Sequence, residues 1–176
     1  MSNKQPKLLI SEEKIQAKVD ELASRISADY RNIDDLIMVG VLKGSFIFLA
    51  DLSRRLSIPR SVDFLALSTY GNNTTTQGEV RMILDLRRSI VGKHVLVVED
   101  IIDTGYTLSY LLETLAARKP ASLKTCALVH KPESCKVAVQ IDYQGFEIPD
   151  VWVVGYGLDW AEKFRTLPYI GVIDPS

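Results

Sequence analysis

The stretch from residue 94 to residue 115, HVLVVEDIIDTGYTLSYLLETL, constrains the fold more than any other part of the chain. Its four apolar residues 95–98 are typical of a strand buried on both faces, as in a parallel sheet covered by helices. Glu99 and Asp100 follow at once, then a third acid, Asp103, and an amphipathic helix predicted over about 105–117. A buried strand that leads directly into a helix indicates an α/β fold.

The rest of the chain continues this alternation of strands and helices. Helices are predicted over 11–29 and after the KGS break at 43–45, and strands over 36–42, 62–69, 79–86, 122–129 and 151–157. We therefore expect a central, mainly parallel sheet flanked by helices, within a single domain over residues 1–176. Ligands of such sheets bind beyond the carboxyl ends of the strands, where the acids of 99–103 lie.

Composition excludes several classes of function. With 21 basic and 22 acidic side chains, the chain lacks the basic excess of a protein that mainly grips nucleic acid. Residues 1–10, MSNKQPKLLI, lack the apolar run expected of a secretion signal, and no stretch approaches the about 18 apolar residues of a membrane span. The two cysteines, Cys126 and Cys135, have no metal-ligand spacing, which favours reduced thiols in a cytoplasmic protein.

The loop after the central strand has the composition of a phosphate cradle. A glycine lets successive N–H groups converge, the helix N-terminus adds favourable potential, and threonine hydroxyls are further donors. The residues concerned are Thr104, Gly105, Tyr106 and Thr107. The alternative, that Asp103 and Thr104 only cap the helix, would be worth about 1 kcal/mol and leaves Glu99 and Asp100 unexplained.

The acid pair requires a different partner from the cradle. Glu99 and Asp100 would repel a phosphate unless they accept hydrogen bonds from hydroxyl groups or help to hold a cation. A sugar with a phosphate and vicinal hydroxyls, accompanied by hydrated Mg²⁺, satisfies the whole set. Asp103 then remains near the anomeric carbon as a candidate general base.

The string VLVVEDIIDTGYT resembles the phosphoribosyl pyrophosphate (PRPP) signature of the type I phosphoribosyltransferases. The resemblance implies that family's fold, with a small hood over the active site formed by the N-terminal segment and residues of about 140–176. Further segments resemble the hypoxanthine–guanine branch. VLKGSF at 41–46 resembles its pyrophosphate loop, where Lys43 and Gly44 bind PRPP and the Leu42–Lys43 peptide can be cis. STYGN at 68–72 resembles its catalytic lid, predicted over about 68–80, with Thr69 and Tyr70 at the tip.

The second half of the chain resembles the base-recognition half of that branch. By this resemblance Lys131 donates to the 6-oxo group of a purine, Trp152 stacks on the ring, and the Val153 backbone reads the base edge. Asp159 joins Glu99 and Asp100 as a Mg²⁺ ligand, and Arg165 contacts pyrophosphate. The chain departs from its relatives at 133–136, ESCK, where Ser134 and Cys135 replace the usual arginines.

The resemblance implies an enzyme of purine salvage that transfers the phosphoribosyl group of PRPP to a 6-oxopurine, with Mg²⁺ as cofactor, as a homodimer or homotetramer. The alternative from another class is a regulator on the same fold that senses PRPP or nucleotides and binds nucleic acid. Among enzymes, a pyrimidine or adenine phosphoribosyltransferase is the nearest competitor. An ammonium donor such as Lys131 favours an exocyclic oxygen over an amino group, which favours a 6-oxopurine.

Overall fold

The computed structural model describes residues 5–70 and 79–174. A six-stranded sheet has the strand order β4-β3-β2-β5-β6-β7, and every neighbouring pair is parallel except β3 and β4. The strands are β2 (Leu36–Leu42), β3 (Arg60–Tyr70), β4 (Glu79–Leu84), β5 (His94–Ile102), β6 (Ser122–His130) and β7 (Tyr143–Glu147). The predicted α/β fold with a mainly parallel sheet is therefore confirmed.

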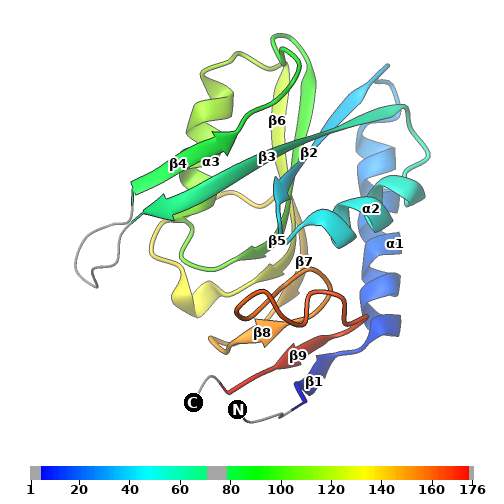
Figure 1. The fold of residues 1–176 in the computed structure, drawn as a ribbon. Helices are drawn as coiled ribbons and strands as arrows, with labels where there is room; N and C mark the ends of the chain where they lie inside the picture. The colour runs from blue at the N-terminus through cyan, green and yellow to red at the C-terminus, as the bar shows by residue number, and fades with distance from the viewer. Residues whose placement is uncertain (1–4, 71–78, 175–176) are drawn as a thin grey trace.

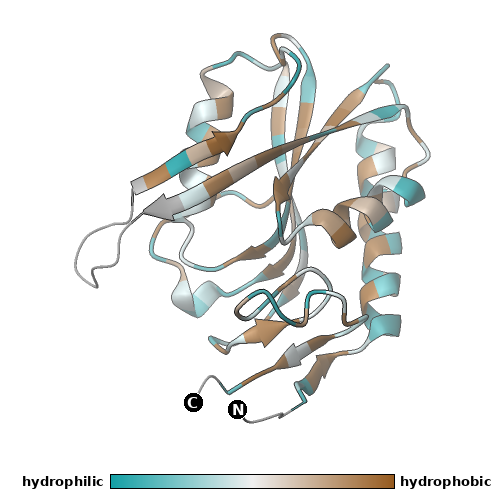
Figure 2. Ribbon diagram, in the orientation of Figure 1, coloured by the Kyte–Doolittle hydropathy of each residue, from teal (hydrophilic) through white to brown (hydrophobic). Residues whose placement is uncertain are grey.

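Helices cover both faces of this sheet (Figure 1). On one face lie α1 (Glu12–Asp29) and α2 (Phe46–Arg55), packed on β2, β5, β6 and β7; on the other lies α3 (Tyr106–Ala116). Figure 2 shows hydrophobic and hydrophilic residues alternating along α1, as expected for a helix with one buried face. Ser11 caps α1 by accepting a hydrogen bond from the Lys14 amide, as its position predicted.

A second, smaller sheet lies against the end of the first, in the order β1-β9-β8 with antiparallel pairing. It consists of β1 (Lys7–Ile10), β8 (Val153–Val154) and β9 (Ile170–Val172), and we call it the hood sheet. Its buried side chains Ile10, Val153 and Ile170 join the core of the α1/α2 face. The two ends of the described chain meet in this sheet, as Figure 1 shows.

Two of the predicted strands differ in extent from those in the structure. The central strand continues through Glu99 and Asp100 to Ile102, because its pairing with β6 persists as far as Ile102 and His130. The predicted strand over 151–157 is wrong beyond Val154: Gly155, Tyr156 and Gly157 all have positive φ and leave the extended conformation.

Candidate active site

The predicted site residues gather where three neighbouring parallel strands end. β2 runs into Lys43 and Gly44, β5 carries Glu99 and Asp100 and precedes Asp103, and β6 ends just before Lys131. β5 lies between β2 and β6 in the sheet, so the three segments emerge side by side. The Leu42–Lys43 peptide is cis, as the resemblance implied it can be.

The loop before α3 has the geometry of the predicted cradle. Gly105 is the N-cap residue with φ 86°, a left-handed conformation that glycine adopts without strain. The cap position is therefore glycine, and neither Asp103 nor Thr104 caps the helix. The amide groups of the first turn point out from the helix N-terminus, an arrangement suited to an anion.

A second segment holds this loop from behind. The amides of Lys136 and Val137 donate to the Thr104 carbonyl at 2.9 and 3.1 Å. A Cβ at Gly105 would overlap the Val137 carbonyl, so only glycine fits at this position. The Cys135 thiol turns back to the Val137 carbonyl at 3.0 Å. The segment that departs from the relatives thus supports the cradle through its backbone amides.

Of the acid pair, Glu99 is shielded from solvent and Asp100 is partly exposed. Glu99 is only 5% exposed, and its burial and the neighbouring Asp100 raise its pKa well above the ordinary value. Burial raises the pKa of Asp100 to about 6, a shift that Arg165 opposes and Asp159 supports. Gly44 lies directly against the Asp100 carboxylate, which a Cβ at that position would overlap. The Lys43–Gly44 loop and the acid pair therefore form one compact unit.

Arg165 links the hood to this unit. Its guanidinium pairs with Asp159 at 2.8 Å and donates to the Gly157 carbonyl at 2.8 Å. Glu162, which the sequence analysis did not identify, pairs with Lys43 at 3.1 Å and lies 3.5 Å from Arg165. The Lys43–Glu162 pair is largely exposed, so it contributes little stability.

Lys131 lies between two carboxylates on the opposite side of the site. Its ammonium is 3.6 Å from Asp103 and 3.4 Å from Asp150, and its side chain is only 7% exposed. Asp150 is the second residue that the sequence analysis missed. The predicted general base and the predicted base-reading lysine are therefore direct neighbours, although β5 and β6 contribute them separately.

The remaining predicted residues lie in the hood or beyond the described chain. Trp152 is 61% exposed and adjoins Val153, whose strand β8 pairs with β9. Thr69 and Tyr70 end β3, and their side chains, with residues 71–78 of the predicted lid, lie outside the described residues.

Within residues 5–70 and 79–174, no group of three or more His, Cys, Asp or Glu side chains is arranged to hold a metal. No helix in those same ranges is long and apolar enough to cross a membrane.

The raised pKa of Asp100 leads to a stability prediction for Asp100→Asn. Because the native pKa of Asp100 is about 6 and its ordinary value is 3.8, the native state gains stability as pH falls through about 6 and has the full gain below about 4. Above that range the charged, buried carboxylate destabilises the ligand-free fold. We expect Asp100→Asn to raise the unfolding free energy by about 1–3 kcal/mol at about pH 8, and by about half as much at about pH 5. Urea unfolding at both pH values checks this; an equal effect at both would contradict it.

Comparison with known proteins agrees with this geometry. The sequence profile of the phosphoribosyl transferase domain matches residues 10–160, so fold and site together define a type I phosphoribosyltransferase. A hypoxanthine-guanine phosphoribosyltransferase of Bacillus subtilis (strain 168) is 48% identical over 170 residues, which cover 97% of this chain and 94% of that protein.

Solved structures agree as well. A hypoxanthine-guanine phosphoribosyltransferase from Bacillus anthracis, with a HEPES molecule in its active site, has a TM-score of 0.91 at 47% identity and covers 97% of this chain and 100% of its own. A hypoxanthine phosphoribosyltransferase from Trypanosoma cruzi, in a ternary substrates complex, has a TM-score of 0.90 at 44% identity, over 96% and 95% of the two chains. The present chain belongs to the hypoxanthine-guanine phosphoribosyltransferases.

Proposed function

We propose that the protein serves purine salvage by transferring the 5-phosphoribosyl group of PRPP to a 6-oxopurine, releasing pyrophosphate. The observation that carries this proposal is the 3.6 Å approach of Lys131 to Asp103 directly beside the Gly105 cradle. A lysine that hydrogen-bonds the 6-oxo group then places N7 of the purine near the carboxylate that accepts its proton. As that proton leaves, N9 attacks the anomeric carbon of the sugar and pyrophosphate departs.

Each end of PRPP has a matching part of the site. The cradle of Thr104, Gly105, Tyr106 and Thr107 holds the 5′-phosphate through backbone amides and hydroxyl groups. The acid pair offers carboxyl oxygens that accept hydrogen bonds from the ribose hydroxyls. The Lys43–Gly44 backbone and Arg165 face the pyrophosphate, and Trp152 offers an exposed stacking surface next to Val153.

Magnesium fits the donor set of this site. Mg²⁺ is usually bound through one or two protein carboxylates plus substrate phosphates, which agrees with the lack of a three-acid cluster among the described residues. Asp100 and Asp159 repel each other across Arg165 and would hold the ion together with pyrophosphate, with Glu99 buried behind them. When bound, the ion neutralises charge on the leaving pyrophosphate.

An ultraviolet assay with PRPP tests the proposed function. Hypoxanthine, guanine, xanthine and adenine are offered separately, each with and without Mg²⁺. We expect turnover of hypoxanthine or guanine, inert adenine, and no turnover without Mg²⁺. If no base reacts while PRPP still binds, the site acts as a sensor and the proposal is wrong.

The proposed oligomer has support on the outer part of the sheet. Val62, Phe64 and Leu84 lie on one face of the β3–β4 pair and are 36–43% exposed. Exposed apolar patches of this kind suit a second copy of the chain. Light scattering is expected to give a dimer or tetramer, and Phe64→Glu a smaller species; a monomeric wild-type protein would contradict this.

The proposed cytoplasmic location rests on the thiols. Both Cys126 and Cys135 are free, as in proteins of reducing compartments.

A further inference from the structure

A tyrosine stands in the hood where the backbone favours glycine. Gly155, Tyr156 and Gly157 have φ values of 100°, 50° and 103°. The left-handed conformation is unfavourable for a residue with a side chain and persists where the surroundings hold it. The surroundings do so here, because Tyr156 is only 3% exposed and its amide donates to the Leu167 carbonyl at 2.8 Å.

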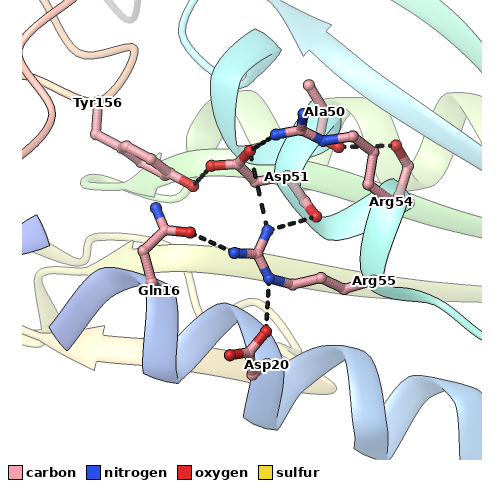
Figure 3. A network of polar contacts seen from close by, with 8 residues as sticks. Gln16, Asp20, Ala50, Asp51, Arg54, Arg55 and Tyr156 are labelled. Carbon is pink, nitrogen blue, oxygen red and sulfur yellow. Dashed lines mark hydrogen bonds and ion pairs between the residues drawn. The ribbon is translucent and has the colours of Figure 1, made fainter. Parts of the chain in front are cut away.

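The Tyr156 hydroxyl group donates a hydrogen bond to Asp51 of α2 at 2.5 Å (Figure 3). Burial raises the pKa of Tyr156, and the bond to Asp51 raises it further, so the phenol stays a donor. Burial opposes ionisation of Asp51, but hydrogen bonds from Tyr156 and Arg54 prevail and lower its pKa. The bond is therefore charge-assisted, and such bonds are stronger than neutral ones.

Asp51 is itself held from α1. It contacts Arg54 and Arg55 on its own helix, and the Arg55 guanidinium reaches Asp20 and Gln16 of α1. Figure 3 shows this chain of contacts running from α1 through α2 to Tyr156. The hood segment is thus tied to both helices that cover this face of the sheet.

Both structural elements joined by this bond lead directly to the pyrophosphate side of the site. α2 begins at Phe46, two residues after Gly44. On the other side, Tyr156 precedes Gly157, whose amide and carbonyl are bonded to the Arg165 carbonyl and guanidinium, each at 2.8 Å. Gly157 also lies directly on the Gly44 backbone, because a Cβ there would overlap the Gly44 carbonyl.

We propose that Asp51, through Tyr156, is a positioning residue for the pyrophosphate of PRPP. The bond sets how closely the Gly157 segment, with Arg165, approaches the Lys43–Gly44 loop. This proposal rests on the proposed function, because it takes PRPP to be the substrate whose binding the Tyr156–Asp51 bond affects. Loss of the bond lets the two sides of the pyrophosphate site separate, while the base site formed by Lys131 and Trp152 keeps its own supports.

The test compares two buried tyrosines. Tyr156→Phe removes the hydroxyl group that donates to Asp51. The control, Tyr143→Phe, removes a comparable buried hydroxyl group, which donates to Asp29 at 2.6 Å and joins β7 to α1. For Tyr156→Phe we expect KM for PRPP and Kd for magnesium pyrophosphate, by calorimetry, to rise about tenfold, because the hydrogen bond lost is to a charged group; tenfold is equivalent to about 1.4 kcal/mol. KM for the purine should change less than about twofold. Tyr143→Phe should lower stability and leave KM for PRPP unchanged.

Three results would overturn the proposal. One is that Tyr156→Phe loses stability like the control but keeps the wild-type KM and Kd, so the bond is only structural. Another is that both variants weaken PRPP equally, which would mean general loosening of the fold. If Tyr156→Phe does not fold, Asp51→Asn is tested instead, because asparagine keeps an acceptor for the tyrosine hydroxyl group but lacks the charge. The third refuting result is an unchanged Kd for magnesium pyrophosphate in that variant. An inactive wild-type protein would refute the proposed function instead, while the calorimetric comparison of pyrophosphate still decides this proposal.

Discussion

Replacing Asp103 with alanine is expected to lower kcat by about 10²–10⁴-fold, the usual contribution of a general base, with little change in PRPP affinity. Asp103 is suited to this role because its side chain is 49% exposed beside the cradle and is fixed by the buried ammonium of Lys131. The carboxylate is therefore accessible to a substrate proton and held in one place. Steady-state kinetics with hypoxanthine and calorimetry with PRPP measure the two effects.

The matched control is Asp150→Asn. Asp150 is the other carboxylate on Lys131, at 3.4 Å, so this variant also removes a charge from the lysine. It should change kcat by less than about threefold, because Asp150 is not placed to take the N7 proton. Wild-type turnover in Asp103→Ala, or an equal loss in Asp150→Asn, would remove Asp103 from the proposed mechanism.

Replacing Lys131 with alanine is expected to lower kcat/KM for hypoxanthine by about 10²-fold, because the 6-oxo group loses a charged donor in a buried site. The substitution also leaves Asp103 and Asp150 without the cation between them. The Kd for PRPP should stay within about twofold of the wild-type value, since the cradle and the pyrophosphate loop are unchanged.

The preference of Lys131→Ala for hypoxanthine over adenine provides an internal control for the assignment of Lys131 to the base site. The wild-type lysine repels the amino group of adenine, so Lys131→Ala should narrow the preference for hypoxanthine over adenine. If the variant instead loses PRPP affinity and keeps purine affinity, the assignment of Lys131 to the base site is wrong.

The parts of the fold that the sequence predicted well are those with uninterrupted patterns. β2 and the first half of β5 are continuous apolar runs between helices with clear faces, so the local pattern and the buried position agree. The DTGYT loop could be assigned to a cradle because its chemistry is local: the glycine, the hydroxyl groups and the helix start lie within five residues.

The parts that were missed depend on distant partners. β1, β7 and β9 are strands of three to five residues whose partners come from elsewhere in the chain, so no local alternation marks them. Asp150 and Glu162 were missed for the same reason. Glu162 reaches Lys43 across 119 residues of sequence, and nothing near either residue indicates the other. The two glycines around Tyr156 were a signal against a strand at 155–157 that could have been used.

The exposed position of Trp152 gives the protein an optical reporter. The chain has only two tryptophans, and Trp152 and Trp160 are both exposed and both lie in the segment that carries the proposed base and pyrophosphate contacts. Indole emission is therefore confined to the hood, while the core contributes none. A purine stacked on Trp152 would quench it, so a Trp160→Phe protein would follow base binding and release in real time, without a label and independently of turnover.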